Sequence, residues 1–331
     1  MNTQEILTAL GPLAPLYSDP DVLEIMVDAP DMVYVDRHRK LEATSVKFES
    51  AEALRAVMDA LLAPAGIALS PEHPIGEVRL PDDARLVAVV PPTALNGPTL
   101  VIRKPLPYRM TWDRLVEYGS VTPEARDFLQ AAIHAGINIL VSGGPASGKT
   151  TVADMLAEMI PADQRLVVVE QTHEMRIDHP HRVWLEAGGP AGVTVVDLLK
   201  TAAQMRPDWL IVGEMFGGEA MHALQLMSVG YHGITPIHAT GAEDALSRLE
   251  TFCLMANLGL GLAEIRRLIA SSIQLITYQE RRPDGSRKFM QFVELAGLEG
   301  DLRYKLRPLF RFNADKQRLE PTGEHPAWEK R

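Results

Sequence analysis

The stretch Gly143-Gly144-Pro145-Ala146-Ser147-Gly148-Lys149-Thr150 decides the fold of this chain, because it matches the phosphate-loop pattern G-x-x-x-x-G-K-[ST]. The apolar residues 137–142 before it predict a buried strand, and residues 151–159 after it predict a helix. In a strand, a glycine-rich turn and a helix in this order, backbone N–H groups and the positive end of the helix converge on an anion. The sequence therefore predicts a nucleotide-binding site.

The residue types within this loop predict which groups the site binds. The Lys149 ammonium is expected to reach the β- and γ-phosphates, and the Thr150 hydroxyl is expected to hold Mg²⁺. The other loop residues, from Gly143 onwards, and Thr151 beyond the loop are expected to line the nucleotide. The predicted cofactors are therefore ATP and Mg²⁺.

Length and composition bound the class of protein. A chain of 331 residues, of which 46% are apolar and 23% charged, suggests a globular protein with two domains that each bury a core. The formal net charge of −10 argues against nucleic-acid binding by the chain as a whole. The one cysteine, Cys253, excludes an internal disulfide and a multi-cysteine zinc site.

The distribution of apolar and basic residues predicts a cytoplasmic protein. Residues 1–5 lack the basic n-region of a signal peptide, and no apolar run approaches the roughly 20 residues of a membrane span. We therefore expect any membrane association to be peripheral, at the inner face of the cytoplasmic membrane and through a partner.

The pattern along the chain predicts two domains. Residues 1–105 indicate an N-terminal α+β domain of short antiparallel strands, and residues 106–121 are the expected linker because prolines interrupt regular structure there. Residues 122–331 alternate helices with apolar strands, which predicts an α/β domain whose parallel sheet is covered on both faces. We expect its last helix at residues 263–275, and loops and short strands beyond Glu280.

Two acids and a histidine stand at the ends of apolar strands, where a nucleotide hydrolase needs polar groups. Residues 209–213 run into Glu214, and residues 166–169 run into Glu170. A carboxylate at a strand end can order Mg²⁺ or polarise water, although an isolated acid there is often only solvated. His238 ends a third strand-like piece and could donate a hydrogen bond to the γ-phosphate, although a lone histidine is usually structural. All three are candidate catalytic residues, and Glu214 is also a candidate Mg²⁺ ligand.

Blocks that follow one another along the chain resemble one family. They are Gly143–Thr151, Glu170–Glu174, Arg206–Ala220 and Ile237–Ala239. Together they resemble the secretion ATPase superfamily, the hexameric motors of type II secretion, type IV secretion and type IV pili. The chain most resembles the CpaF-type motor of Tad (Flp) pili, on the blocks Pro81–Arg85, Gly97–Pro105, Asp244–Glu250 and Ile265–Ile273. The resemblance covers about residues 10–312.

The resemblance implies a fold, a function and a set of site residues. It implies a RecA-like P-loop ATPase domain preceded by a smaller α+β sensor domain, with ATP bound between the two domains of a hexameric ring. Arg85 and Arg103 match arginines that reach the phosphates, whereas on their own they would read as solvated strand residues. Glu214 and Glu170 would organise metal and water, and His238 would sense the γ-phosphate. The expected function is an ATPase motor for pilus assembly or protein secretion, with inner-membrane platform proteins as partners.

The chain departs from the family pattern at positions close to the expected site. Gln171 stands in place of an aspartate, Phe216 of an arginine, Tyr231 of a histidine and Pro236 of a small polar residue. The loss of a carboxylate and a cation predicts nucleotide binding with reduced turnover, so a weakly active regulatory ATP-binding subunit is one alternative. A nucleic-acid translocase with a RecA-like core is another, against which the acidic net charge speaks. We expect no direct nucleic-acid partner and no zinc.

Overall fold

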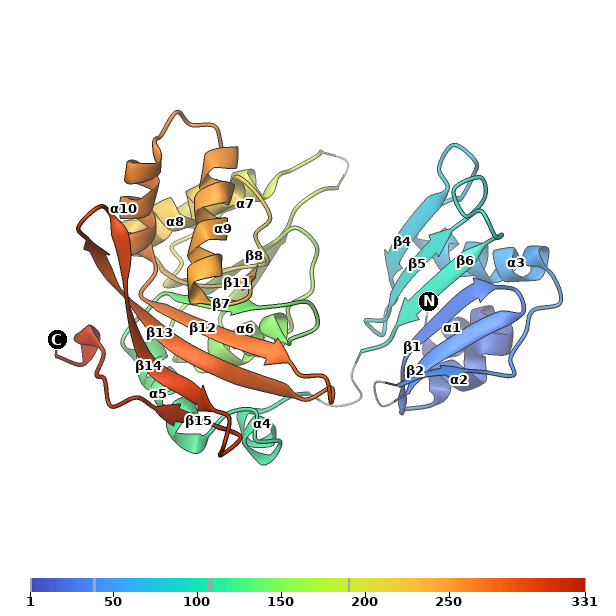
Figure 1. The fold of residues 1–331 in the computed structure, drawn as a ribbon. Coiled ribbons are helices and arrows are strands. Elements are labelled where there is room, and N and C mark those ends of the chain that lie inside the picture. Colours follow the sequence, from blue (N-terminus) through green and yellow to red (C-terminus); the bar gives the residue numbers. More distant parts are fainter. Residues whose placement is uncertain (1, 38–39, 106–108, 190, 331) are drawn as a thin grey trace. The chain divides into compact units, whose positions relative to one another are not determined.

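The computed structural model describes residues 2–37, 40–105, 109–189 and 191–330, and of residues 329 and 330 only the backbone. The chain forms two compact units, Met1–Arg109 and Met110–Arg331, which Figure 1 draws from blue to red along the sequence. No helix in the described ranges is long and apolar enough to cross a membrane. Within the expected linker, residues 106–108 lie outside the described residues, and Leu115 and Val121 are buried in the core of the second unit.

The first unit is an antiparallel sheet with helices on one face (Figure 1). Its elements are α1 (Thr3–Leu10), η1 (Gly11–Leu13), α2 (Ala14–Ser18), β1 (Val22–Ala29), β2 (Met32–Arg37), β3 (Lys40–Ala43), α3 (Ala51–Leu62), η2 (Ala63–Ala65), β4 (Ile75–Arg79), β5 (Arg85–Val89) and β6 (Thr99–Arg103). Among the described residues the strand order is β3-β2-β1-β6-β5-β4. Alternate residues such as Leu86 and Ile102 are fully buried against the helices, while the residues between them lie on the other face. The expected α+β character is confirmed.

Side-chain caps explain where two of the helices begin. The Ser50 hydroxyl accepts a hydrogen bond from the backbone N–H of Ala53 at 3.2 Å and caps α3. Thr122 caps α5 (Pro123–His134) in the same way, and a proline at the first helical position costs no hydrogen bond there.

The second unit is built on a larger, mixed sheet. Its further elements are α4 (Trp112–Glu117), β7 (Ile139–Gly143), α6 (Lys149–Ala157), β8 (Leu166–Glu170), β9 (Arg182–Glu186), α7 (Val195–Gln204), β10 (Trp209–Val212), α8 (Glu219–Ser228), β11 (His232–His238), α9 (Ala242–Met255), α10 (Leu262–Ser272), β12 (Leu275–Arg281), β13 (Arg287–Glu299), β14 (Arg303–Asn313), β15 (Arg318–Pro321) and η3 (Ala327–Lys330). In the part of the chain that the structure describes, the strand order is β15-β14-β13-β12-β7-β11-β10-β8-β9. The strands from β12 to β9 run parallel, and those from β12 to β15 run antiparallel.

Buried side chains cover both faces of this sheet, as the continuous apolar strands predict. In β7, Ile139 and Val141 belong to the core shared with α5 and α6. Leu140, between them, points to the opposite core, which α7, α8, α9 and α10 complete. The α/β architecture is therefore confirmed. The phosphate loop follows β7, which lies between β12 and β11 inside the sheet.

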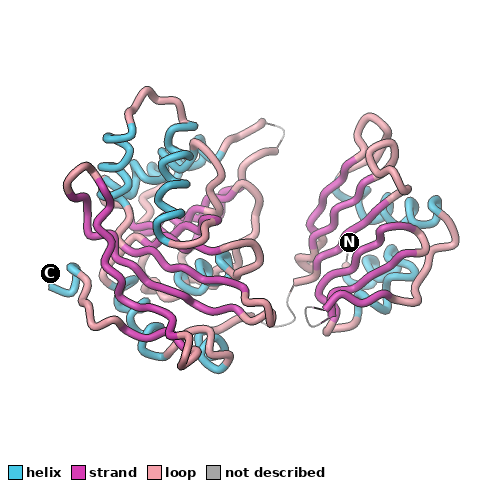
Figure 2. The backbone as a smooth tube through the Cα atoms, in the orientation of Figure 1, coloured by secondary structure: helices cyan, strands magenta, loops and turns pink. Residues whose placement is uncertain are grey.

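The end of the chain corrects the prediction. Instead of loops and short strands beyond Glu280, the structure has β13 with 13 residues and β14 with 11, seen as long magenta strands in Figure 2. β13 buries Phe292 in one core and Val293 in the opposite core, and register shifts interrupt its pairing with β14, so the sequence lacks the simple alternation that marks a strand. The helix expected over residues 263–275 ends at Ser272, because Leu275 pairs with Ile139 as the first residue of β12.

Candidate functional site

The phosphate loop connects β7 to α6 and turns its backbone toward one side. Gly148 caps α6 with a φ of +95°, in the left-handed region that favours glycine, and Ala146 has a φ of +56°. Left-handed residues among right-handed ones turn successive N–H groups toward a common point, which makes an anion-binding concavity. Because this concavity lies at the N-terminus of a nine-residue helix, the helix dipole adds to the attraction for phosphate.

The base of the loop is packed too closely to admit a larger residue. A Cβ atom at Gly143 would overlap the hydroxyl of Ser147 and lie 2.5 Å from the backbone oxygen of Gln279 in β12. At Gly144 no atom lies within 4 Å of the position that a Cβ would take. The first glycine of the motif is therefore required by packing, and the second leaves open space beside the loop.

Lys149, the first residue of α6, meets Glu214 and His238 at the carboxyl ends of β10 and β11. The Nζ atom of Lys149 is hydrogen-bonded to the backbone oxygen of Gly144 at 3.2 Å and lies 3.1 Å from Nδ1 of His238. Oε1 of Glu214 lies 3.6 Å from that Nζ and 3.0 Å from Nε2 of His238. The structure thus brings three sequence-predicted site residues into one cluster, even though up to 89 residues of chain separate the groups in contact.

Burial shifts the titration of all three groups. It lowers the pKa of the Lys149 ammonium, against the opposing effect of Glu214, and raises the pKa of the Glu214 carboxyl, against the opposing effect of Lys149. Burial and then the Lys149 charge lower the pKa of His238 below its usual value of 6.5. The imidazole is therefore neutral at pH 7. Since the Lys149 ammonium can only donate to Nδ1, the imidazole proton is on Nε2, facing Glu214.

Glu170 is held by the segment that follows it. Its Oε1 accepts hydrogen bonds from the backbone N–H groups of Glu174 at 2.8 Å and Met175 at 2.9 Å, and its Oε2 lies 2.9 Å from Nδ1 of His173. The carboxylate is only 3% exposed. Gly213 lets it approach the neighbouring strand, because a Cβ there would lie 3.1 Å from Cγ of Glu170. Glu170 thus fixes the path of residues 171–175 beside the end of β10.

Thr150 and Thr151 lie in the first turn of α6, directly after Lys149, and both are partly exposed. Because α6 begins at Lys149, these two residues follow directly on the phosphate loop. The Thr150 hydroxyl and the Glu214 carboxylate are oxygen donors of the type that Mg²⁺ prefers. The residues present therefore fit a magnesium nucleotide.

In the first unit, Arg85 and Arg103 are directly opposite one another in the β5–β6 pair. Residues opposite one another in an antiparallel pair project from the same face of the sheet. Arg79 is opposite Arg85 in the next pair, so the three arginines form a row across β4, β5 and β6. Buried Leu86 and Ile102 point to the helix-covered face, which places this row on the other face.

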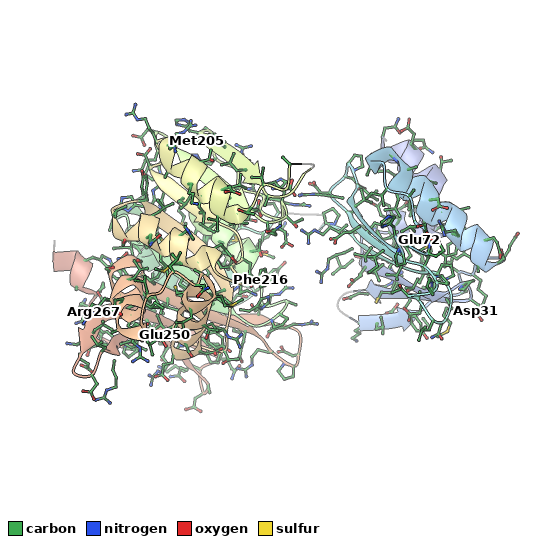
Figure 3. All side chains as sticks on the ribbon, turned by 90° about the horizontal axis from the view of Figure 1, so that it is seen from above. Asp31, Glu72, Met205, Phe216, Glu250 and Arg267 are labelled. Atoms are coloured by element: carbon green, nitrogen blue, oxygen red, sulfur yellow. The ribbon has the colours of Figure 1, made fainter. Side chains whose placement is uncertain are left out.

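The departures from the family pattern have different structural settings. Gln171 is exposed, and Phe216, labelled in Figure 3, is 59% exposed with its ring centroid 6.2 Å from that of His238. The Tyr231 hydroxyl donates a hydrogen bond to the backbone oxygen of Ala203 at 3.1 Å. Pro236 lies beyond the last residue pair between β10 and β11, so its missing N–H costs no hydrogen bond on that side.

Two residues beside the loop escaped the sequence analysis. Gln279 in β12 pairs in register with Gly143, and Arg287 at the start of β13 donates from Nε to the backbone oxygen of Ala146 at 2.9 Å. No local motif marks either residue. Only the sheet order, which places β12 next to β7, brings them to the loop.

Comparison with known proteins places the chain in a family. The family described as Type II/IV secretion system protein matches residues 7–286. A putative conjugal transfer protein of Mycobacterium tuberculosis is 30% identical in an alignment 309 residues long that covers 90% of this chain and 87% of that protein. The type IV secretion system protein PtlH of Bordetella pertussis is 33% identical in an alignment 308 residues long that covers 82% of this chain and 89% of that protein.

A solved structure supports the fold. The crystal structure of the Legionella pneumophila ATPase DotB is similar with a TM-score of 0.61 and 16% identity, over 83% of this chain and 77% of that one. At this identity the likeness concerns the fold, a RecA-like domain preceded by a smaller N-terminal domain. The chain therefore belongs to the Type II/IV secretion system protein family of the secretion ATPase superfamily.

Proposed function

We propose that this secretion ATPase, a motor for secretion or pilus assembly, binds ATP with Mg²⁺ at the phosphate loop and hydrolyses it with Glu214 and His238. The observation that carries the proposal is the cluster of Lys149, Glu214 and His238 beside the loop, with distances of 3.0 to 3.6 Å between its members. A buried cation, a carboxylate and a neutral imidazole at the end of a phosphate loop form a typical set for phosphoryl transfer.

Each residue of this cluster has a part in the proposed reaction. Lys149 and the loop N–H groups hold the phosphates, and Thr150 and Glu214 supply oxygen ligands to Mg²⁺. When bound, Mg²⁺ would offset the negative charge that develops on the phosphate oxygens. Glu214 also orients water, and His238 senses the γ-phosphate through the Nε2 proton that it otherwise directs at Glu214. Glu170 acts on the same site through His173 and residues 171–175.

We further propose a hexameric ring in the cytoplasm that docks on inner-membrane platform proteins of a Tad-type or type IV secretion machine. The row of Arg85 and Arg103 on one face of the sheet supports this, because guanidinium groups bind phosphate oxygens well. The phosphates of ATP, in the same or a neighbouring subunit, are the proposed anion. The domain division remains the one proposed from the sequence, an N-terminal domain over 1–105 and an ATPase domain over 122–331.

ATP hydrolysis by the purified full chain tests the catalytic part of the proposal. Phosphate release should require Mg²⁺, stop with excess chelator and fall to background in Lys149→Ala. Lys200→Ala is the matched control, because Lys200 is exposed on α7. Equal hydrolysis by Lys149→Ala and the parent chain would refute the assignment.

Native mass measurement tests the ring. With a non-hydrolysable ATP analogue, the parent chain should form a species of six subunits, and Arg85→Ala with Arg103→Ala should weaken its formation. A strict monomer at micromolar concentration, with and without the analogue, would contradict the ring.

A further inference from the structure

Gln279 lies in β12, directly beside the start of the phosphate loop. It pairs in register with Gly143, the last residue of β7. Its side chain belongs to the face of the sheet that α6 covers, as do those of Leu275 and Ile139, which form the pair four residues earlier in both strands. Gln279 is 3% exposed. Its Nε2 atom lies 3.7 Å from the position that a Cβ would take at Gly148. The carboxamide therefore reaches the turn that precedes α6.

This carboxamide group has an unused hydrogen-bond donor. Among the described residues, Nε2 of Gln279 has no hydrogen-bond partner, and the same is true of Oγ of Ser147, which is 2% exposed. The two side chains are neighbours, because a Cβ at Gly143 would overlap Oγ of Ser147 and lie 3.2 Å from Cγ of Gln279. The buried donor of Gln279 and the buried hydroxyl of Ser147, which can accept a hydrogen bond, thus lie close together beside Gly143.

The other contact from the β12–β13 hairpin shows that this hairpin supports the loop. Arg287 donates to the backbone oxygen of Ala146, one residue before Ser147. Buried polar groups are nearly always hydrogen-bonded, so a neighbouring donor and acceptor without partners indicate a bond that forms in another conformation of the loop. Ser147 lies between the two left-handed residues that shape the anion-binding concavity, so a small adjustment of the loop around a bound phosphate would move its hydroxyl.

We propose that Gln279 is a positioning residue for the nucleotide site: nucleotide binding brings Nε2 of Gln279 and Oγ of Ser147 into a hydrogen bond that stabilises the phosphate-bound loop. The inference rests on the proposed function, since it requires that the loop binds a nucleotide. It assigns a role to a strand residue outside the phosphate-loop motif, and that role is to raise nucleotide affinity rather than to stabilise the fold.

The variant Gln279→Met separates these two roles. Methionine fills a similar volume but removes the donor, so the unpaired buried group disappears from the protein without nucleotide. We expect the melting temperature without nucleotide to stay the same or rise, the dissociation constant for ADP to increase about five- to tenfold, and the ADP-induced rise in melting temperature to shrink. Gln291→Met in β13 is the control, since Gln291 is also partly buried in a strand but is not next to the loop.

Calorimetric titration of the full chain with ADP gives these dissociation constants, and Ser147→Ala completes a double-mutant cycle. If the two side chains act as a pair, Ser147→Ala in the Gln279→Met background weakens ADP binding much less than it does in the parent chain. Additive losses, an unchanged ADP affinity in Gln279→Met, or a lower melting temperature without nucleotide would each overturn the inference. If the parent chain binds ADP no better than Lys149→Ala does, the proposed function itself fails, which is a different result.

Discussion

Nε2 of His238 lies 3.0 Å from Oε1 of Glu214, so a side chain at the end of β11 meets one just beyond the end of the neighbouring strand β10. The contact joins a proton donor that is neutral at pH 7 to a carboxylate whose pKa is raised by burial. Under the proposed function, a change at the γ-phosphate that moves one of these side chains would also move the other.

Replacing Glu214 by glutamine tests whether its charge is needed for chemistry. Glu214→Gln keeps the size of the side chain but removes the carboxylate that we propose to bind metal and polarise water, so kcat should fall by about 10²-fold or more. Nucleotide binding should persist, because Lys149 and the loop remain. Steady-state phosphate release and titration with a fluorescent ADP analogue measure the two effects. Glu117→Gln, an exposed acid at the end of α4, should match the parent, and loss of binding in Glu214→Gln would contradict this assignment.

The two glycines at the start of the loop should differ in their tolerance of alanine. Gly143→Ala forces its Cβ against the backbone oxygen of Gln279, which no rotamer change can relieve, so the free energy of unfolding should fall by about 1–3 kcal/mol. Gly144→Ala meets open space, so its effect should stay below about 1 kcal/mol. Urea midpoints of the second unit's transition compare them. Equal midpoints for the two variants would show that the loop base adjusts freely.

The sequence predicted the loop and its neighbouring acids because the signals are local. The residues expected to bind the phosphates all lie within the motif 143–150. Glu214 and Glu170 each end an apolar run that is visible in the sequence. Gln279 lacked such a signal, since it reaches the loop only through the pairing of β12 with β7. Sheet order is a property of packing over long sequence distances, and local periodicity does not encode it. The same limit explains why residues 287–313 were not recognised as two long strands.

The lone thiol should be inert in the folded protein. Cys253 in α9 is 3% exposed, and burial, with a smaller effect of Glu250, raises its pKa from 9.0 to about 12. At pH 8.5 iodoacetamide should therefore label it only after unfolding in urea. Above pH 9 the thiol loses its proton in the unfolded chain before it does so in the folded protein. The free energy of unfolding should therefore fall between pH 9 and about 12. Cys253→Ala should remove that part of the pH dependence, and rapid labelling of the folded chain would contradict the burial.

Restoring the family residues at two departures should speed hydrolysis. Phe216 is 59% exposed beside His238, and Gln171 is exposed beside Glu170, so a guanidinium and a carboxylate can be introduced at these positions while remaining solvated. The arginine would place a cation near Glu214 and the phosphates, and the aspartate would restore a carboxylate that orders water or metal. We expect Phe216→Arg with Gln171→Asp to raise kcat several-fold, which corresponds to about 1 kcal/mol of transition-state stabilisation.

Each single variant adds one charge without the other and should gain less, so kcat of the double variant is compared with that of both single variants and of the parent. Leu260→Arg, which adds a guanidinium at an exposed loop position, controls for a general effect of positive charge. A double variant that folds, binds ATP and hydrolyses it no faster than the parent would show that the surroundings already compensate for both departures.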